Sequence, residues 1–300
     1  MTTQQTRPEV SAVVVTWNSN SDIVECLTSL ERELAPLPSE IIVVDNGSGD
    51  GTVETVRAVA PAARVIANPA NRGLAAANNQ GLAAARGSIV LICNADVVFR
   101  PDSVRAMVDL LGRHQRAGWV VPRILHEDGA VQTSVGDLPS LGETLLGRQV
   151  ARRRAPGDRS GFWWDGWAHD AELMVGRGFE CAYAVRRSAL NDVGGQDERY
   201  VLDWEGFDWA ERFHRAGWEI WFTPNAEVVH FGGTSRRQVP FRSVVSQHRG
   251  MYLYFSDRGP KARKPFLALA FTTRAAVKLL LTALGVPLYR WAHRDRRRGA

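Results

Sequence analysis

Apolar runs that alternate with helical segments constrain the fold of this sequence more than any other feature. Val10–Thr16, Glu40–Val44 and Ile89–Cys93 are short, largely aliphatic runs that predict buried strands. The segment Asp22–Glu33 lies between the first two runs and has apolar residues at helical spacing. Strands and helices that alternate in this way are typical of a parallel sheet covered by helices on both faces. The sequence therefore predicts an α/β protein with a mostly parallel, doubly wound sheet.

Polar residues follow these predicted strands directly. The run Ile89–Cys93 breaks into Asn94-Ala95-Asp96, and Glu40–Val44 leads into the glycine-bearing loop Asp45–Thr52. Ligands bind at the carboxyl ends of strands in open parallel sheets. The hard oxygens of Asn and Asp suit Mg²⁺ or Mn²⁺ that carries substrate phosphates, and a loop carboxylate can bind a base or a ribose hydroxyl. Such residues also form turns and helix caps, so each motif alone leaves both interpretations open.

Two common nucleotide-binding motifs are absent from the sequence. No G-x-G-x-x-G follows the first predicted strand, and the pattern G-x-x-x-x-G-K-[ST] does not occur. Both absences disfavour a dinucleotide-binding Rossmann fold and a P-loop nucleotide hydrolase.

Charge is distributed unevenly along the chain. Residues 241–300 contain 13 Lys and Arg against 2 Asp and Glu, whereas the remaining 240 residues contain 24 against 30. A basic C-terminal segment predicts an anionic partner surface. No recognised nucleic-acid-binding motif accompanies the charge, so we expect a phospholipid surface and no nucleic acid. Three cysteines without metal-type spacing, and a polar N-terminus without an apolar signal segment, favour a cytoplasmic setting.

Four short motifs, taken together, resemble the N-terminal half of a family 2 glycosyltransferase of the GT-A fold. They are Val13–Asn18, Val43–Ser48, Asn71–Gly73 with Asn79, and Asn94–Asp96. The resemblance implies a hexosyltransferase-type enzyme with a nucleotide-sugar donor, a divalent cation (Mg²⁺ or Mn²⁺) and inversion at the anomeric carbon. Asn94 stands where many relatives have Asp, and it matches the rhamnosyltransferase-like branch.

The same resemblance implies a set of donor-binding residues. Asp45 and Asn46 would lie near the base and the ribose, and Asp96 would bind the metal that bridges the diphosphate. The implied donor site comprises Thr16, Asn18, Asp45, Asn46, Asn71, Gly73, Asn79, Asn94 and Asp96.

The second half of the chain resembles the acceptor side of actinobacterial rhamnosyltransferases that act on lipid-linked sugars. The shared patterns are G-G-x-D-E-R-Y at Gly194–Tyr200, R-A-G-W at Arg215–Trp218, and a strand that ends in His230. With these patterns the resemblance extends over roughly Val10 to Arg258. It implies that His230 is a second metal ligand beside Asp96, although a lone histidine at a strand end is equally often structural.

Gly206 departs from the family pattern at the residue that matters most for catalysis. An inverting transfer needs a base that takes the proton of the acceptor hydroxyl. Relatives usually carry Glu-Asp-x-Asp at this helix start, and the second residue is the presumed base. Glycine cannot accept a proton, so three candidates remain: Glu205 first, then Glu180, whose long side chain can reach the vacated space, and then Asp208. A non-catalytic nucleotide-sugar-binding protein stays an alternative.

The apolar segment Pro265–Tyr289 contains two cations, Arg274 and Lys278, on one helical face. A membrane-spanning helix would place both near the bilayer centre, at about 2.5–3.5 kcal/mol each. We therefore expect an amphipathic helix in the membrane interface, with these cations toward lipid phosphates and the basic residues Arg290–Arg298 extending the charge. The alternative is a helix that packs on the domain and precedes a basic tail.

These inferences divide the chain into a flexible N-terminus (residues 1–9), a GT-A catalytic domain (10–240) and a basic amphipathic helical extension (241–300). The catalytic domain comprises a nucleotide-sugar half (10–122) and an acceptor half (123–240). The expected function is metal-dependent, inverting transfer of a sugar to a glycan or polyprenyl-linked acceptor in cell-envelope polysaccharide synthesis, at the inner face of the plasma membrane. Branch resemblance suggests dTDP-rhamnose as the donor. Glycosylation of a soluble natural product is the alternative, and the oligomeric state stays open, a homodimer included.

Overall fold

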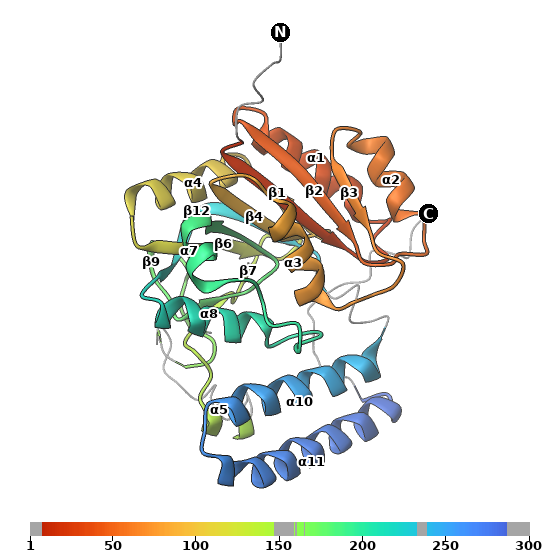
Figure 1. The fold of residues 1–300 in the computed structure, drawn as a ribbon, viewed down its shortest axis with the longest axis vertical. Coiled ribbons are helices and arrows are strands. Elements are labelled where there is room, and N and C mark those ends of the chain that lie inside the picture. Colours follow the sequence, from red (N-terminus) through yellow and green to blue (C-terminus); the bar gives the residue numbers. More distant parts are fainter. Residues whose placement is uncertain (1–7, 147–158, 160, 165, 233–238, 287–300) are drawn as a thin grey trace.

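A mixed β-sheet runs through the middle of the molecule, with helices packed on both of its faces (Figure 1). The structure is a computed structural model that describes residues 8–146, 159, 161–164, 166–232 and 239–286. Within those residues, ten strands form the sheet, and its main path has the order β3-β2-β1-β4-β11-β6-β12-β5. Residues 1–7 of the predicted flexible N-terminus lie outside the described residues.

The N-terminal part of the sheet consists of four parallel strands, as the sequence predicts. They are β1 (Val10–Thr16), β2 (Ser39–Asp45), β3 (Arg64–Ala67) and β4 (Ile89–Asn94). The register pairs Thr16 with Asp45 and Val15 with Asn94. The carboxyl ends of β1, β2 and β4 therefore meet at one edge of the sheet.

Helices cover the two faces of the sheet in separate groups. The first group is α1 (Ile23–Leu34), α2 (Thr52–Val59) and α4 (Ser103–Arg113). The second group is α3 (Leu74–Ala84), α7 (Arg187–Val193) and α8 (Glu205–Arg215). Successive residues of a strand point to opposite faces, so Ala12 and Val14 pack in the first core while Val13 and Val15 pack in the second.

The C-terminal part of the sheet departs from the parallel pattern. Strand β11 (Ala182–Arg186) is antiparallel to both of its neighbours, β4 and β6 (Ala117–Leu125). Strand β12 (Glu219–His230) is parallel to β6, and its register shifts between Thr223 and Glu227. The short elements are β5 (Val97–Phe99), β7 (Val131–Gln132), β8 (Val135–Gly136), α5 (Leu141–Leu146), β9 (Leu173–Met174) and β10 (Arg177–Gly178). Strand β11 begins at the edge of the sheet where β4 ends, because Ala182 pairs with Cys93.

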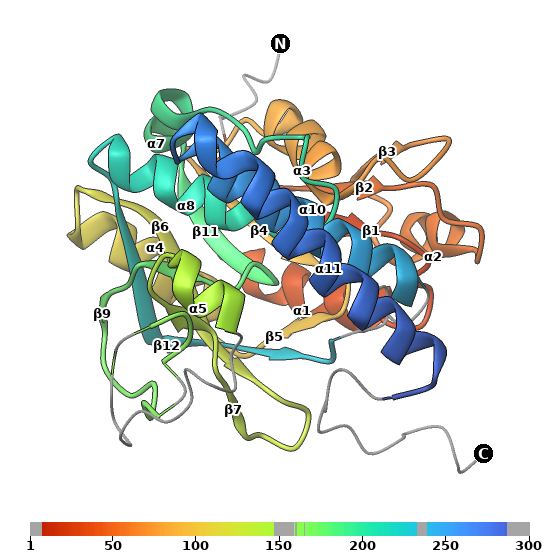
Figure 2. The ribbon, with the colours of Figure 1, turned by 90° about the horizontal axis from the view of Figure 1, so that it is seen from below.

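A helical hairpin lies on one side of this domain, beneath α8 and α5 in Figure 1. It consists of α10 (Pro240–Asp257), a 3₁₀ turn (Lys261–Arg263) and α11 (Lys264–Ala283). Seen from below, α11 lies in front of α10 and is the outermost layer of this side (Figure 2). The hairpin attaches through an apolar cluster that includes Trp204, Phe255 and Phe271.

The orientation predicted for the two cations of α11 is wrong. Arg274 donates hydrogen bonds of 2.7 Å to the carbonyl oxygens of Thr144 and Leu145 in α5. Lys278 donates to Gln247 of α10 at 3.2 Å. Burial, with Arg274 nearby, lowers the pKa of Lys278 to about 8. Both cations therefore face the protein and not a lipid surface, whereas Arg290–Arg298 lie outside the described residues.

Candidate active site

Asp45 is the centre of a cradle at the ends of β1 and β2. Its side chain is buried, and its Oδ2 atom accepts hydrogen bonds from the backbone N–H groups of Gly47 (3.2 Å) and Ser48 (3.0 Å). Gly47 has φ +81°, and a Cβ atom there would lie 2.7 Å from the backbone of Ala70. The loop after β2 therefore folds back tightly around the carboxylate.

Two buried oxygens in this cradle lack a hydrogen-bond partner among the described residues. They are the second carboxylate oxygen of Asp45 (Oδ1) and the hydroxyl of Thr16 (Oγ1). Buried polar atoms normally have partners, since an unpaired one costs about 1–3 kcal/mol. An unsatisfied acceptor and hydroxyl at the carboxyl ends of parallel strands are suited to a ligand that donates N–H or O–H groups.

Asn46 and Asn71 shape the loop that precedes α3. The side-chain amide of Asn46 donates to the carbonyl oxygen of Gly73 and to Asn71 Oδ1, both at 3.1 Å. Its Oδ1 atom accepts from the backbone of Arg72 at 3.0 Å. Gly73 has φ +93°, and its N–H donates to Asn71 Oδ1 at 3.0 Å. These residues join the ends of β2 and α3 into one rim of the cradle.

Asn18 and Asn79 connect loops in two different places. Asn18 Oδ1 accepts from the backbone of Gly49 at 2.9 Å, so it ties the loop after β1 to the loop after β2. Asn79 on α3 donates to the carbonyl oxygen of Gln196 (2.8 Å) and to Glu198 (3.0 Å). The structure thus brings Asn79 against the acceptor half of the chain.

Asp96 and His230, the two residues expected to bind metal, lie together. Asp96 is in the turn after β4, and His230 ends β12, with 3.6 Å between Asp96 Oδ2 and His230 Nε2. The backbone of Phe231 donates to the carbonyl oxygen of Asp96 at 3.0 Å, which fixes the two segments side by side. His230 Nδ1 lies 3.3 Å from Gln132 Oε1.

This pair fits a cation that a substrate helps to coordinate. No group of three or more His, Cys, Asp or Glu side chains able to hold a metal occurs in the described part of the chain. Mg²⁺ usually binds one or two protein ligands and completes its shell with water and substrate phosphates. Asp96 retains a side-chain exposure of 15%, which leaves its carboxylate open to such a complex.

Glu180 and Glu205 form a carboxylate pair next to this pair. Glu180 precedes Cys181, whose carbonyl oxygen accepts a 2.8 Å hydrogen bond from the backbone of Asn94, so Glu180 lies at the Asp96 end of the sheet. Its Oε2 atom accepts from the side chain of Gln196 at 3.1 Å. Burial raises the pKa of Glu180 well above its ordinary value, and the negative charge of Glu205 raises it further.

The carboxylate of Glu180 occupies the space that a side chain at position 206 would fill. A Cβ atom built on Gly206 would lie 1.2 Å from Glu180 Oε1. The residues before Gly206 are in unusual conformations, since Asp203 and Trp204 have φ values of +63° and +73°. Glu180 and Gly206 therefore depend on each other sterically, and a carboxylate is present at the helix start despite the glycine.

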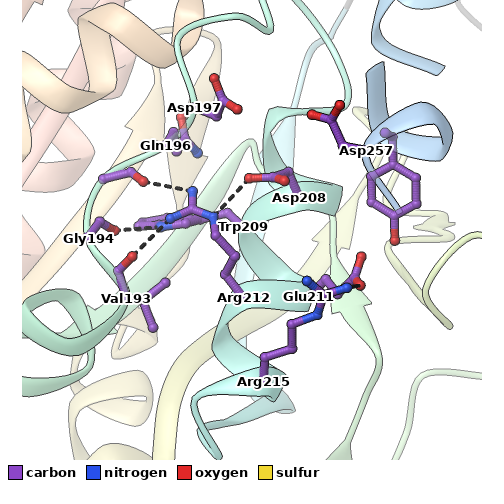
Figure 3. A network of polar contacts seen from close by, with 12 residues as sticks. Val193, Gly194, Gln196, Asp197, Asp208, Trp209, Glu211, Arg212, Arg215 and Asp257 are labelled. Atoms are coloured by element: carbon purple, nitrogen blue, oxygen red, sulfur yellow. Dashed lines mark hydrogen bonds and ion pairs between the residues drawn. The ribbon is translucent and has the colours of Figure 1, made fainter. Parts of the chain in front are cut away.

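Asp208 is buried within an ion-pair network along α8 (Figure 3). Its Oδ2 atom is 2.9 Å from Nε of Arg212, and its Oδ1 atom is 2.6 Å from Nη2 of Arg258. Arg212 also donates to the carbonyl oxygens of Val193 (2.9 Å) and Gly195 (2.7 Å). Both oxygens of Asp208 are thus held by guanidinium groups that fasten neighbouring segments to α8.

Sequence reasoning missed Arg177, which lies beside the carboxylate pair. Its side chain is buried, and its guanidinium carbon lies 3.7 Å from the ring centroid of Trp163 and 4.5 Å from that of Phe207. Its positive charge favours the ionised form of Glu180 and partly offsets the effect of burial. A lone arginine between two glycines was the only signal in the sequence.

The family assignment follows from direct comparison with known proteins. The sequence model of Glycosyl transferase family 2 matches residues 11–167, which is just over half of the chain. This chain belongs to that family. A relative from Mycobacterium tuberculosis, described as an N-acetylglucosaminyl-diphospho-decaprenol L-rhamnosyltransferase, is 31% identical over 260 residues, which cover 76% of this chain and 80% of the relative. The chain is thus a glycosyltransferase.

Solved structures support the GT-A fold of this family 2 member. The mannosyltransferase PcManGT from Pyrobaculum calidifontis, in complex with GDP-Man and Mn²⁺, has a TM-score of 0.55 at 21% identity and covers 95% of this chain and 82% of its own. TarS from S. aureus has a TM-score of 0.52 at 16% identity, with 95% of this chain and 76% of its own covered. The predicted fold class, with a mostly parallel sheet and a C-terminal helical extension, is confirmed.

Proposed function

We propose that this glycosyltransferase inverts the anomeric centre as it transfers L-rhamnose from dTDP-rhamnose to a polyprenyl-linked N-acetylglucosamine acceptor. The observation that carries the proposal is the convergence of Asp96, His230 and the carboxylate pair Glu180–Glu205 at the edge of the sheet where the Asp45 cradle lies. The donor and acceptor classes are those in the name of the mycobacterial relative.

The Asp45 cradle suits the nucleoside part of the donor. Asp45 Oδ1 and Thr16 Oγ1 have no hydrogen-bond partner among the described residues. The carboxylate oxygen of Asp45 can accept a hydrogen bond from a base N–H, and the hydroxyl of Thr16 can donate one to a base or ribose oxygen. Asn46, Asn71 and Gly73 hold the rim of the cradle, and Asn18 holds its loops together. Asn79 acts by fastening the acceptor half to α3.

Asp96 and His230 would hold the divalent cation, Mg²⁺ or Mn²⁺. Their 3.6 Å approach and the partial exposure of Asp96 fit a two-ligand protein site. When bound, the cation supplies positive charge that stabilises the departing nucleoside diphosphate. Asn94, next to the pair, fixes the turn through its backbone hydrogen bond to Cys181.

Glu180 is the base in this proposal, and Glu205 tunes it. Glu180 as a residue keeps partial exposure, and its carboxylate occupies the space of a residue-206 side chain, where relatives carry the presumed base. The neighbouring charge of Glu205 raises the pKa of Glu180, which makes it a better proton acceptor near neutral pH. Asp208 is engaged by two arginines and serves to hold α8.

The reaction is a single displacement. The acceptor hydroxyl oxygen forms a bond to the anomeric carbon while the bond from that carbon to the diphosphate oxygen breaks. The hydroxyl proton passes to the carboxylate of Glu180, and the bonding electrons leave with the nucleoside diphosphate. Attack from the face opposite the leaving group inverts the configuration.

A direct assay tests the proposal. The purified chain is incubated with Mn²⁺, dTDP-rhamnose and a short-chain polyprenyl diphosphate N-acetylglucosamine, and mass spectrometry and NMR identify the product and its anomeric configuration. Transfer with inversion, abolished by EDTA, supports the proposal. Binding of the donor without turnover on any acceptor indicates a nucleotide-sugar-binding protein. Turnover on soluble aglycones alone places the enzyme in natural-product glycosylation.

A further inference from the structure

Helix α11 presents its apolar side chains to the outside of the molecule. Among the described residues, Lys261–Ala283 is the one helix long and apolar enough to cross a membrane by length and composition. Only 11% of its most apolar 18-residue stretch is buried inside the protein. The large apolar side chains exposed by 53–70% on α11 and just after it are Phe266, Leu269, Val277, Leu280 and Leu284. At 100° per residue, they lie within an arc of about 80°. We call these five residues the outer stripe.

The opposite face of α11 attaches the helix to the protein. Leu267 and Phe271 are buried in the apolar cluster around Trp204. One turn further along, Arg274 bonds to two carbonyl oxygens of α5, and Lys278 bonds to α10. Because these contacts hold both cations against the domain, α11 cannot turn its outer stripe inward or separate to span a bilayer without breaking them.

The hairpin that carries the outer stripe has several exposed cations, and acidic residues are nearly absent from it. Residues 240–283 contain Asp257 as their sole acidic residue, and it pairs with Arg199 at 2.8 Å. Exposed cations on α10 and the turn before α11 are Arg242, Arg249, Lys261 and Arg263. An exposed apolar stripe on a hairpin rich in exposed lysine and arginine has the composition of a segment that lies in the interface of an anionic membrane.

We propose that the outer stripe of α11 is the surface by which this enzyme docks on an anionic phospholipid bilayer. The helix lies flat, with the stripe in the boundary between headgroups and acyl chains and with the exposed cations of the hairpin near lipid phosphates. The proposal rests on the proposed function, since a polyprenyl-linked acceptor is itself held in a bilayer. It reverses the sequence-based orientation, because Arg274 and Lys278 face away from the lipid.

The hairpin also connects the docking surface with the reaction centre. A Cβ atom at Gly250 of α10 would lie 2.8 Å from the side chain of Trp204, so the two helices α10 and α8 approach closely there. Trp204, which immediately precedes Glu205 and has a positive φ, belongs to the apolar cluster that attaches the hairpin. In Figure 1, α8, α10 and α11 follow one another as successive layers. A bilayer in contact with α11 would therefore lie on the same side of the molecule as the hairpin, whose helix α10 packs against the start of α8.

Vesicle flotation of the full chain tests the docking surface. The probes are phosphatidylcholine vesicles with and without phosphatidylglycerol, and the variant is Leu269→Glu/Leu280→Glu. A matched control, Val24→Glu/Val131→Glu, makes the same change at two residues of α1 and β7 that are exposed by 40% and 41%. We expect the wild type and the control to float with the anionic vesicles, and the stripe variant to lose binding about tenfold or more.

Activity measurements separate this proposal from the proposed function. Transfer to a water-soluble acceptor analogue reports catalysis without a membrane, and the stripe variant should retain it within about twofold while losing transfer to acceptor in vesicles. Equal flotation of the stripe variant and the control overturns the docking proposal. The docking proposal is also overturned if the wild type does not float and instead forms a dimer in solution that the stripe variant dissociates. That result would assign the outer stripe to contact with a second copy of the chain. Absence of transfer to either acceptor, with flotation intact, contradicts the proposed function alone.

Discussion

In residues 10–122 the polar side chains of the candidate site lie at the carboxyl ends of parallel strands. In residues 123–240 they lie where the side chain of one segment fills space that another segment leaves empty. Thr16, Asp45 and Asn94 are positioned by the register of β1, β2 and β4. Glu180 is positioned because Gly206 has no side chain. Backbone topology thus positions the proposed donor side, and side-chain packing between distant segments positions the proposed base.

Replacing the proposed base, Glu180, should have the largest effect on turnover. Glu180→Gln keeps the shape of the side chain and its contact with Gln196 but cannot take a proton. We expect kcat to fall by about 10²–10⁴ while donor affinity, measured by calorimetry, stays within about twofold. Unchanged turnover would move the role to Glu205.

Asp96→Asn should reduce turnover by about 10²-fold at low Mn²⁺, with part of the loss recovered as Mn²⁺ is raised. The substitution removes a charged metal ligand beside His230. Titrations of activity against Mn²⁺ concentration measure the resulting change in metal dependence. Thermal stability should change little, since the Asp96 carboxylate is partly exposed. A variant with wild-type metal dependence would contradict the assignment of the cation site.

Gly206→Ala tests whether the two halves of the base site depend on each other. The new Cβ atom would displace the Glu180 carboxylate, so we expect turnover to fall by about tenfold or more. Gly112→Ala is the matched control, because Gly112 also lies in a helix and has nothing within 4 Å of a Cβ atom. Alanine favours a helix over glycine by about 0.5–1 kcal/mol, so the control should melt slightly higher with unchanged turnover.

Glu205→Gln should change the pH dependence of the rate more than its maximum. The rate requires ionised Glu180, so kcat/KM should rise with pH through the raised pKa of that group. Removing the negative charge of Glu205 lowers the pKa of Glu180 and moves the rising limb toward lower pH, with a plateau within about tenfold of the wild type. If the rise of kcat/KM occurs at the same pH in both proteins, Glu205 does not affect the pKa of Glu180.

Asp208→Asn should have the smallest effect on turnover, about twofold. Because the substitution weakens the ion pairs with Arg212 and Arg258, its main consequence should be a melting temperature lower by a few degrees. Calorimetry and turnover on the same samples separate the two effects. A large loss of turnover without loss of stability would make Asp208 a catalytic residue.

The sequence predicted the strands and loops of residues 10–122 well because their signals are local. Each strand is a continuous apolar run, and the side chains that matter follow it directly, as Asp45 and Asp96 do. His230 was placed beside Asp96 by resemblance, and the structure brings the two within 3.6 Å.

Other features depend on contacts between distant segments that periodicity does not reveal. The antiparallel direction of β11, the burial of Arg177 among aromatic rings and the attachment of Asn79 to Gln196 are of this kind. Arg274 and Lys278 show the limit most clearly. The sequence correctly places both on one helical face. It does not reveal that this face points toward the protein, because that depends on the carbonyl oxygens of α5 that Arg274 contacts.

Arg258 fastens the helical hairpin to the domain by charge, in addition to the apolar contacts of α11. Standing just past the end of α10, it forms ion pairs with both Asp208 and Glu211 of α8. A deletion series from the C-terminus should consequently tolerate trimming in the region after α11. A protein that ends before residue 258 would lose these ion pairs as well as the buried residues of α11, so expression yield should fall well before the deletion reaches the end of α10.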